Sequence, residues 1–542
     1  MEIRDRYAPS PTGLQHIGGI RTALFNYLFA RSRGGKFILR LEDTDRTRFD
    51  PSYVQNLYDT FAWLGLHWDE GPDAGGPAGP YIQSERFELY KKYAAGLVEA
   101  GKAYYCFCSP QRLEAVRKER EAAHASETGY DRHCRDLPPA EAARRAEAGE
   151  AHTIRLKIPL GGDLPVTRFR DQLLGDIEWK NSDINPDPVL LKSDGFPTYH
   201  LANVVDDHLM GISHVLRAQE WLPSTPLHVI MYQAFGWEYP EYCHLPMVMG
   251  QDGKKLSKRH GATSIDEFRR QGYLPEALIN YVALLGCSYE EGGDFQGEAG
   301  LPSRKTGIYT LEELERRFSL DKLNKAPAIF DYKKLEWYNG HYIRMKSDQE
   351  LAALALPWAA GLFGKSGNLP SRDEGLSAQN GGLPSQGEGK PSPEQWRAFI
   401  AAMPLIKERV SFLQEIPAKL EYLFSEPPLP QAEEFIPKKS DLRETIRLLR
   451  LGRSLLEPMA GANDQEAEAL AKAEAERREV KLGDLLMPLR VAVTGSRVSP
   501  PLFGSVRILG AVRCLERADR ALAVLEGAAG NSGPSLAERD AQ

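Results

Sequence analysis

The feature that most constrains the fold is the stretch from Arg6 to Asp45, which is typical of a strand, a helix and a second strand. The first strand is expected over residues 3–8 and the second over 37–41, and Gly34 and Gly35 stop the helix between them. The apolar positions of that helix are Ile20, Ala23, Leu24, Tyr27 and Leu28. Such a unit favours parallel pairing of its two strands.

The polar residues of this stretch fall at one end of the unit, where ligands of doubly wound sheets bind. The glycines Gly13, Gly18 and Gly19 allow the backbone to approach a ligand closely, and the helix that begins there directs its free amides towards a phosphate. His16 is a candidate donor to the same phosphate. Taken alone, HIGG favours an ordinary tight turn with a surface histidine.

A second stretch, MVMGQDGKKLSKRHG from Met247 to Gly261, places a hairpin-type turn at Asp252 and Gly253 before a run of basic residues. Basic runs are usually solvated surface. The pair HIGG and KLSKR, in this order, resembles the HIGH and KMSKS motifs of class I aminoacyl-tRNA synthetases. In that class the lysines stabilise the charge on the pyrophosphate leaving group of ATP.

Four motifs narrow the resemblance to bacterial glutamyl-tRNA synthetases. They are APSPTGLQHIGG, LRLEDTD, GFPTYHLANVVDDHLMGISHVLRAQEW (Gly195 to Trp221) and FDYKKLEWYNGHYI (Phe330 to Ile343). The resemblance implies an α/β fold: a class I Rossmann-like parallel-sheet catalytic domain with an inserted acceptor-binding domain, followed by an all-α C-terminal anticodon-binding region. The implied domains are 1–92 and 195–250 (catalytic), 93–194 (inserted), 251–335 (stem contact, bearing the KMSKS-like loop) and 336–542 (anticodon binding).

Composition agrees with a large cytoplasmic enzyme. A chain of 542 residues that is 42% hydrophobic and 26% charged is expected to form several globular domains. No run of eighteen apolar residues occurs, and MEIRDRY is too charged for a secretory signal, so no membrane partner is expected. The net charge of -7 argues weakly against nucleic acid but says nothing of local basic patches. The six cysteines are too widely spread to form a disulfide framework. We also expect a monomer.

The charges of glutamate predict which residue types bind it. Glutamate carries an ammonium and two carboxylates, and fork-shaped arginines read carboxylates specifically. Matched to the family, the glutamate-binding positions are Arg6, Ala8, Ser10, Glu42, Tyr199, Asn203 and Arg217. Glu42 is expected to hold the ammonium, and Arg217, helped by Arg6 and Tyr199, the carboxylates.

The implied chemistry needs no nucleophilic side chain, because the α-carboxylate of glutamate attacks the α-phosphate of ATP and the protein positions groups and neutralises charge. The expected catalytic residues are His16, Lys255 and Lys258, and the expected ATP-binding residues are His16, Gly18, Gly19, Glu220, Trp221 and Lys258. Magnesium is expected to bridge the phosphates. The resemblance further implies that tRNA is required for activation.

Three cysteines within the inserted segment, Cys106, Cys108 and Cys134, could hold zinc, which takes four ligands in a tetrahedron. Some relatives carry zinc here, with a tyrosine or a histidine as fourth ligand. We expect Asp136, at the position of that histidine, as the fourth ligand, with Tyr130 and His133 as alternatives. Three reduced thiols without metal remain the competing interpretation.

Beyond the basic loop the chain is expected to be helical. Arg316, Arg317, Lys322 and Lys325 cluster in a segment that in the family contacts the tRNA stem, although such charges more commonly form a solvated helix face. Residues 289–300, 362–393 and the tail after Glu526 are rich in Gly, Ser, Pro, Gln or Glu and are expected to be insertions or extensions without chemistry.

The amphipathic helices expected after Ser392 disfavour two relatives of the front half: glutaminyl-tRNA synthetases, which end in β-barrels, and a truncated tRNA-modifying relative that has no anticodon domain. Arg409, in KERVSF, resembles an arginine that reads the last anticodon base in relatives restricted to glutamate tRNA. Two alternatives stay open: an enzyme that also charges glutamine tRNA, and a catalytically silent tRNA-binding paralogue.

Overall fold

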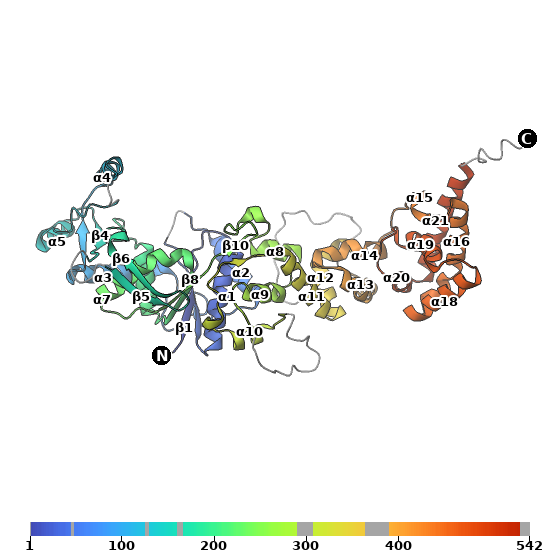
Figure 1. The fold of residues 1–542 in the computed structure, drawn as a ribbon, viewed down its shortest axis with the longest axis horizontal. Helices are drawn as coiled ribbons and strands as arrows, with labels where there is room; N and C mark the ends of the chain where they lie inside the picture. The colour runs from blue at the N-terminus through green and yellow to red at the C-terminus, as the bar shows by residue number, and fades with distance from the viewer. Residues whose placement is uncertain are drawn as a thin grey trace, which may run out of the picture. The chain divides into compact units, whose positions relative to one another are not determined.

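The computed structural model divides into two compact units, coloured along the chain in Figure 1. The first comprises residues 1–269 and 275–335, and the second comprises 270–274 and 336–542. The residues that the structure describes are 2–44, 48–124, 129–159, 166–289, 307–363 and 390–531. Within these ranges no helix has the length and apolar composition needed to cross a membrane.

The N-terminal stretch forms the expected strand, helix and strand: β1 (Arg4–Tyr7), α1 (Ile17–Ser32) and β2 (Lys36–Leu39). Strands β1 and β2 pair in parallel, with Arg4 opposite Lys36 and Tyr7 opposite Leu39. The chain leaves α1 through Gly34, whose φ of 64° is accessible to glycine at little cost. Helix α1 is buried on most of its faces, so the five predicted apolar positions are only part of its buried surface.

A four-stranded sheet continues the fold, in the order β6 (Gly175–Lys180), β5 (Val166–Asp171), β9 (Glu241–Leu245) and β8 (His214–Ala218). Strand β9 is parallel to both β8 and β5, and the β5 pairing places Asp171 opposite Tyr242. The N–H of Ser213, just before β8, donates to the carbonyl of Arg4 at 2.9 Å and so joins β8 to β1. Strand β5 belongs to the segment expected as a separate insertion, yet it lies in the sheet of the catalytic strands.

The remainder of that segment forms an antiparallel sheet, β3 (Ala103–Cys106), β4 (Thr153–Leu156) and β7 (Val189–Leu191). Its helices are α3 (Phe87–Glu99), α4 (Pro110–Ala122) and α5 (Pro139–Glu147). Buried residues of α3 and of this sheet share one hydrophobic cluster with α6 (Tyr199–Leu209) and α7 (Thr225–Phe235). The insertion is therefore packed continuously onto catalytic helices, while the boundaries at residues 92 and 194 stay predictions.

The basic loop follows β10 (Val248–Met249), which pairs in parallel with β11 (Ala328–Ile329). The expected turn is present: Gly253 has φ of 72°, and its N–H donates to the carbonyl of Gly250 at 3.1 Å. The helices of this part of the chain are α2 (Pro51–Leu64), α8 (Ile265–Gln271), α9 (Pro275–Ala283) and α10 (Leu311–Arg317). In the predicted basic segment, a capping box between Thr310 and Glu313 starts α10.

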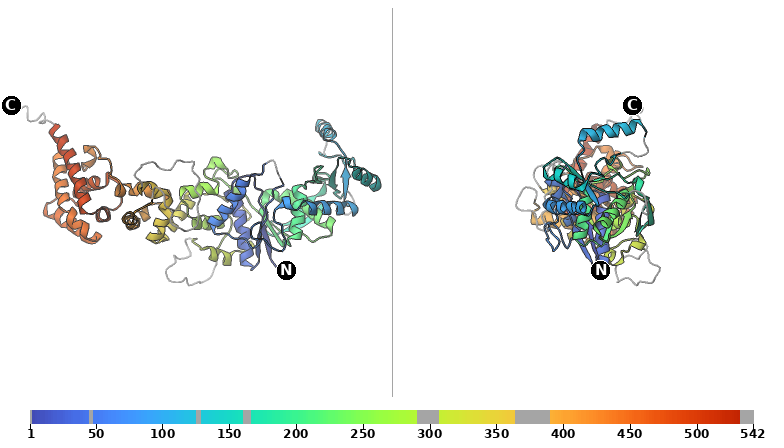
Figure 2. Two further views of the ribbon diagram at one scale, coloured as in Figure 1. Left: turned by 180° about the vertical axis from the view of Figure 1, so that it is seen from behind. Right: turned by 90° about the vertical axis from the view of Figure 1, so that its left-hand side faces the viewer.

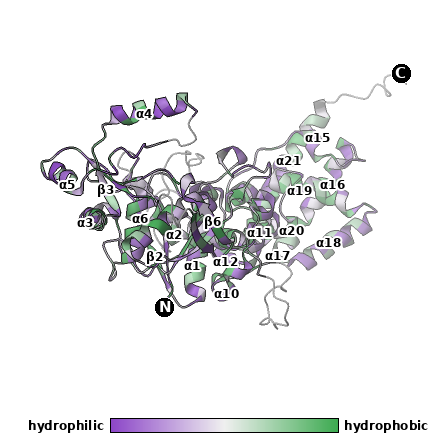
Figure 3. Ribbon diagram, turned by 60° about the vertical axis from the view of Figure 1, so that its left-hand side comes forward, coloured by the Kyte–Doolittle hydropathy of each residue, from purple (hydrophilic) through white to green (hydrophobic). Residues whose placement is uncertain are grey.

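The described part of the second unit contains helices and no strands, as the orange and red segments of Figure 2 show. They are α11 (Tyr332–Met345, which begins in the first unit), α12 (Asp348–Phe363), α13 (Pro393–Ile406), α14 (Ile416–Phe424), α15 (Ala432–Phe435), α16 (Leu442–Ser454), α17 (Leu456–Gly461), α18 (Asp464–Arg477), α19 (Leu482–Thr494), α20 (Leu502–Leu509) and α21 (Ala511–Asn531). Helix α16 buries Thr445, Leu448, Leu449 and Gly452, the spacing of one helical face. The helices carry hydrophobic and hydrophilic faces (Figure 3), which confirms the expected all-helical end.

Most residues of the three predicted insertions or extensions lie outside the described residues: 290–300, 364–389 and 532–542. Their flanks are ordinary structure. Leu362 lies in the last turn of α12, and the side chain of Ser392 caps the N-terminus of α13. Beyond Glu526 the chain continues α21 as far as Asn531.

Candidate active site

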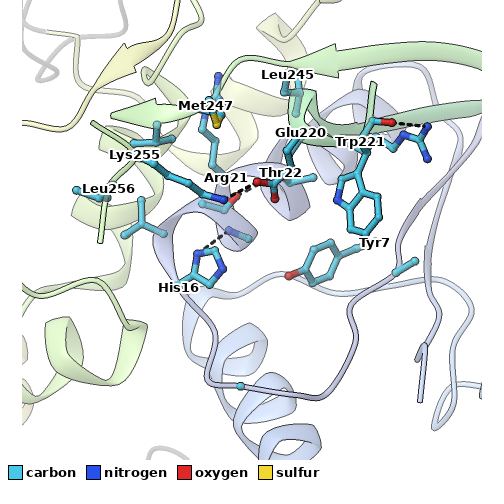
Figure 4. A pocket seen from close by; sticks show the side chains of 18 of the residues that line it. Tyr7, His16, Arg21, Thr22, Glu220, Trp221, Leu245, Met247, Lys255 and Leu256 are labelled. Atoms are coloured by element: carbon cyan, nitrogen blue, oxygen red, sulfur yellow. Dashed lines mark hydrogen bonds and ion pairs between the residues drawn. The ribbon is translucent and has the colours of Figure 1, made fainter. Parts of the chain in front are cut away.

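A pocket of about 720 Å³ lies beyond the carboxyl ends of β1, β2 and β8, next to the first turn of α1 (Figure 4). This is where ligands bind in open parallel sheets. Its lining brings together these predicted site residues: Arg6, Ala8, His16, Gly18, Gly19, Glu42, Tyr199, Asn203, Arg217, Glu220, Trp221 and Lys255. Ser10 does not line the pocket, because it lies in an exposed part of the turn after β1. Lys258 opens a short 3-10 helix, Lys258–His260, and its side chain lies outside the described part of the structure.

His16 caps the N-terminus of α1, with its Nδ1 accepting the backbone N–H of Gly19 at 3.3 Å (Figure 4). Since Nδ1 is an acceptor, the neutral ring carries its proton on Nε2, which is then a donor. Burial by the pocket walls, helped by the charge of Lys255, lowers the pKa of His16 below its ordinary value, while Glu220 acts in the opposite direction. The Gly19 amide that was expected to face a phosphate therefore donates to His16 in this structure.

The glycines at the start of α1 leave no room for a side chain. A Cβ on Gly19 would lie 2.9 Å from the hydroxyl oxygen of Tyr7, and one on Gly18 would lie 3.2 Å from the His16 ring. The Tyr7 hydroxyl is itself fixed, because it donates to Oε1 of Gln15 at 2.9 Å. Glycine thus lets the first turn of α1 pass close to β1.

Lys255 extends from the basic loop across the pocket to Glu220, and its Nζ lies 2.5 Å from Oε2 of Glu220 (Figure 4). Both side chains remain about half exposed, at 61% and 46%. Glu220 and Trp221 lie in a short 3-10 helix, Gln219–Ser224, and the Trp221 ring packs against Tyr199 with 4.8 Å between ring centroids. The pocket thus places a partly exposed cation opposite the helix terminus and an aromatic surface beside the arginines.

The basic loop is closed by contacts that sequence reasoning missed. Nε2 of His260 lies 3.0 Å from Oδ1 of Asp252, and Nδ1 of His260 accepts the N–H of Ser257 at 3.0 Å. A Cβ on Gly250 would lie 2.7 Å from the His260 ring, so the loop folds tightly over this residue. The Asp-Gly turn and the histidine three residues after the Ser of KLSKRH are the sequence signals that could have indicated it.

The predicted glutamate-binding side chains lie in one buried region of the pocket. Arg6 donates from Nε and Nη2 to the two carboxylate oxygens of Asp207, at 3.0 and 3.3 Å. Arg217 donates from Nη1 to the Tyr199 hydroxyl at 3.3 Å. Arg6 and Arg217 are 4% and 5% exposed. Two nearly buried guanidinium groups in one pocket suit a dianionic ligand.

Glu42 supplies the opposite charge in the same region. It is 8% exposed, and its Oε1 accepts from Nη2 of Arg40 at 3.0 Å. Burial raises the pKa of Glu42 above its ordinary value, although the charges of Arg40 and Arg6 oppose that change. A carboxylate in this state gains from a further cation, which is what the ammonium of an amino acid provides.

Arg40 and Asp207 connect these groups and were missed from sequence. Arg40 donates from Nη1 to Asp207 at 2.6 Å, so Asp207 holds both Arg6 and Arg40, and Arg40 holds Glu42. Asp206, which precedes Asp207 in the sequence, accepts a hydrogen bond from Nε of Arg86 at 2.7 Å. Two adjacent acids within the apolar run LANVVDDHL are the signal that could have found them, because buried carboxylates require cationic partners.

A second cluster lies in the inserted segment, where the thiols of Cys106, Cys108 and Cys134 all lie within 4.8 Å of one another. The Cys108 and Cys134 sulfurs are 3.6 Å apart, and the Tyr130 hydroxyl oxygen lies 3.2 Å from the Cys106 sulfur. Asp136, the expected fourth ligand, is exposed and does not belong to this group, and neither does His133. Of the three fourth ligands considered from sequence, the structure brings only Tyr130 to the thiols.

The sheet topology, the helix terminus and the basic loop are those of a class I tRNA synthetase. A family model described as "tRNA synthetases class I (E and Q), catalytic domain" matches residues 2–337, and an anticodon binding domain model matches residues 350–522.

Full-length relatives narrow the class to one family. The chain is 56% identical over 525 residues to a glutamate–tRNA ligase of Treponema denticola, covering 96% of this chain and 99% of the relative. It is 49% identical over 523 residues to that of Borrelia duttonii, covering 96% and 95%. A crystal structure of a glutamate tRNA ligase from Elizabethkingia meningosepticum in complex with its amino acid is similar with a TM-score of 0.79 and 31% identity, covering 97% of this chain and 100% of that one. The chain belongs to the glutamate–tRNA ligase family, which confirms the resemblance seen in its motifs.

Proposed function

We propose that this chain activates L-glutamate with ATP and transfers it to the 3′ end of glutamate tRNA. The observation that carries the proposal is the composition of a single pocket. It joins two buried arginines and a buried carboxylate, suited to an amino acid with a second carboxylate, to a helix N-terminus and a lysine, suited to phosphates. A module that only binds tRNA has no need of this arrangement.

In the activation step, Glu42 holds the ammonium of glutamate, and Arg217, with Arg6 and Tyr199, holds its carboxylates. The free α-carboxylate oxygen attacks the α-phosphorus of ATP, the bond to the bridging oxygen breaks, and pyrophosphate leaves. His16 donates its Nε2 proton as a hydrogen bond to a phosphate oxygen, and Lys255 and Lys258 neutralise the charge that develops on the leaving group. Trp221 and Glu220 flank the nucleotide.

In the transfer step, a ribose hydroxyl at the 3′ end of the tRNA attacks the glutamyl carbonyl carbon and AMP leaves. We propose that residues 93–194 bind the acceptor end of the tRNA, that residues 251–335 contact its stem, and that the helical region 336–542 binds its anticodon. The basic residues of the stem-contact region are Arg316, Arg317, Lys322 and Lys325. We propose that the enzyme acts in the cytoplasm as a monomer and that tRNA binding precedes activation.

Two metals accompany the proposal. Magnesium binds mainly through phosphates and a few carboxylates, and Glu220, whose carboxylate is half exposed in the pocket lining, is the residue that would hold it. The ion would neutralise phosphate charge.

Zinc fits the cysteine cluster. A tetrahedral ion with bonds of about 2.3 Å to sulfur holds two thiolates roughly 3.8 Å apart, and the 3.6 Å between Cys108 and Cys134 is close to that spacing. Tyr130 would supply the fourth ligand and the ion would crosslink the insertion. Three reduced thiols without metal are the competing state.

Arg409 supports a preference for glutamate tRNA. It lies in the short 3-10 helix Lys407–Arg409 with its side chain exposed, and its Nη1 donates to the carbonyl of Ser499 at 2.9 Å. Among the residues that the structure describes, this hydrogen bond orients the guanidinium and leaves other N–H groups to read a base edge. The alternative, an enzyme that also charges glutamine tRNA, requires that this arginine tolerate either final anticodon base.

The test is charging of purified glutamate tRNA and glutamine tRNA in parallel, with glutamate, ATP and magnesium, and with Lys258→Ala as the inactive control. Charging of glutamate tRNA alone supports the proposal, and Arg409→Gln should then reduce the preference. Charging of both identifies the less selective enzyme. Binding of tRNA with neither charging nor pyrophosphate exchange would establish the silent paralogue.

A further inference from the structure

Arg217 is held by several polar groups, two of which, the buried side chains of His244 and Thr225, lie outside the predicted site. Its Nε donates to Nε2 of His244 at 3.1 Å, and its Nη2 donates to Oγ1 of Thr225 at 2.8 Å and to the carbonyl of Trp221 at 3.3 Å. With the contact to Tyr199, four of the five N–H groups of this guanidinium meet an acceptor in the described structure. The plane of the guanidinium is therefore fixed before any ligand arrives.

The protonation of His244 follows from its two neighbours. Its Nδ1 lies 2.6 Å from Oδ2 of Asp171, and its Nε2 faces Arg217. A carboxylate only accepts hydrogen bonds and a guanidinium only donates them, so the imidazole must carry its proton on Nδ1 and a lone pair on Nε2. Burial, together with Arg217, lowers the pKa of His244 against the opposing effect of Asp171, which favours the same neutral ring.

Asp171 is fixed in turn by the backbone. Its Oδ1 accepts the N–H groups of Leu173 and Leu174 at 2.9 and 2.8 Å, and its Oδ2 accepts the N–H of His244 at 3.0 Å. It is the last residue of β5, in register with Tyr242 of β9. The side chains of Asp171 and His244 are fully buried. A chain of contacts thus runs from the backbone through Asp171 and His244 to Arg217.

We propose that Asp171 and His244 are positioning residues that set the orientation of Arg217 and thereby the affinity of the pocket for the carboxylates of its amino acid. Asp171 fixes the histidine tautomer, and the lone pair on Nε2 then holds the guanidinium. The inference rests on the proposed role of Arg217 in binding glutamate. It adds a contribution from the inserted segment, which supplies Asp171, to an amino-acid site otherwise built from catalytic strands and helices.

The decisive variant is Asp171→Asn, which keeps the shape and removes one acceptor. If the new NH₂ replaces Oδ2, it donates to Nδ1 of His244, the ring proton moves to Nε2, and a donor then faces Nε of Arg217. If it replaces Oδ1, it faces the N–H groups of Leu173 and Leu174 and loosens the same carboxamide. Either arrangement puts donor against donor in a buried site.

Glutamate-dependent pyrophosphate exchange, with glutamate tRNA present, separates the outcomes. We expect Asp171→Asn to raise KM for glutamate about 10-fold or more, because removing a residue that orients a ligand-binding side chain commonly has an effect of that size. KM for ATP should change less than about two-fold. Asp176→Asn is the matched control, because Asp176 lies on the same hairpin with its side chain 85% exposed. It should leave both KM values unchanged.

Thr225→Val provides a second test if Asp171→Asn does not fold. It removes the hydroxyl that bonds Arg217 and lies 3.0 Å from Nε2 of His244, and it should raise KM for glutamate selectively. Arg217→Lys, measured beside it, tests the proposed function separately. The positioning role would be overturned if Arg217→Lys raised KM for glutamate strongly while the folded Asp171→Asn left it unchanged. If Asp171→Asn is unfolded, an unchanged KM for glutamate in Thr225→Val would overturn the role instead. Equal rises in the KM values for glutamate and ATP would also overturn it. An unchanged KM for Arg217→Lys would overturn the role of Arg217 itself.

Discussion

Nη1 of Arg40 lies 2.6 Å from Oδ1 of Asp207, and the two side chains are 0% and 2% exposed. Asp207 also accepts from Arg6, so one carboxylate pairs with two buried guanidinium groups, one of which lines the pocket. Removing one partner of a buried ion pair is costly, because the charge that remains is neither solvated nor paired.

Asp207→Asn should therefore lower the free energy of unfolding by about 3–5 kcal/mol. Chemical denaturation followed by circular dichroism measures the change. Asp183→Asn is the control, since Asp183 is exposed in the same unit and should shift the transition by less than about 0.5 kcal/mol. Similar transitions for both variants would show that the buried cluster contributes little to stability.

A pH dependence should arise from His200, whose Nδ1 lies 3.0 Å from Nε2 of His228. Burial, with a further contribution from Arg217, lowers the pKa of His200 to about 4. The unfolded chain binds a proton at this residue below about pH 6.5, whereas the folded chain does not until about pH 4. Stability from this group is thus fully present above pH 6.5 and is lost as the pH falls towards 4.

The loss amounts to about 3 kcal/mol for a shift of this size. Urea denaturation of the wild type at several pH values between 7 and 4 should show a falling free energy of unfolding. In His200→Gln the free energy of unfolding should fall less steeply between pH 7 and 4. Part of the fall that remains should come from His228, because burial lowers the pKa of His228 as well. Equal slopes for the two proteins would contradict the assignment to His200.

Lys255→Ala should separate catalysis from stability. The ion pair of Lys255 with Glu220 is about half exposed, and such pairs contribute about 0–1 kcal/mol. Its loss should leave the melting temperature nearly unchanged while lowering kcat for adenylate formation about 100-fold to 1000-fold, the usual effect of removing one charge-stabilising donor. Single-turnover experiments measure the rate constant of adenylate formation. Lys254→Ala, on the same loop, is the control. A kcat within three-fold of wild type would exclude a catalytic role.

The contact between Gly19 and Tyr7 predicts a rescue. Gly19→Ala places a methyl group 2.9 Å from the Tyr7 hydroxyl oxygen, so α1 or β1 must shift and the phosphate side of the pocket should suffer. KM for ATP should rise, and Tyr7→Phe in the same chain should restore much of the loss by removing that oxygen. Gly96→Ala is the control: Gly96 lies in α3 with nothing within 4 Å of its added Cβ. Failure of Tyr7→Phe to improve the double variant would refute the steric explanation.

The cysteine cluster predicts bound metal. Protein purified without chelators should contain about one zinc ion per chain by elemental analysis, since three thiols and a phenol oxygen supply four ligands. Cys108→Ser should abolish the zinc, and Cys287→Ser, which changes a buried thiol elsewhere, should not. Wild-type protein free of zinc would favour the three reduced thiols.

The sequence was sufficient where a pattern is local. The helix that begins after His16 and ends near Gly34 follows from local periodicity and a glycine stop signal, and the amphipathic pattern after Ser392 correctly indicates an all-helical region, although its individual helix breaks were not predicted. The pocket residues were placed by motifs that lie at the ends of adjacent strands, so most of them converge as expected. Ser10 is the exception, because a short turn can direct neighbouring residues to opposite sides.

The sequence was insufficient where distant segments meet. No local pattern shows that Val166–Asp171 pairs with Glu241–Leu245, or that His244 lies between Asp171 and Arg217. Arg40 and Asp207 are 167 positions apart and form one ion pair. The fourth residue of the cysteine group depends on the path of a loop, which brings Tyr130 to the sulfurs and leaves Asp136 in solvent.

The pairing of β5 with β9 limits how the molecule can be cut. A fragment made by excising the whole of residues 93–194 would lose Asp171, and with it the strand beside His244. A shortened chain would have to keep the β5–β6 hairpin, although strands β3 and β4 of the antiparallel sheet precede this hairpin and strand β7 follows it. The inserted segment therefore contributes a buried residue, Asp171, to the polar contacts that hold Arg217 in the pocket lining.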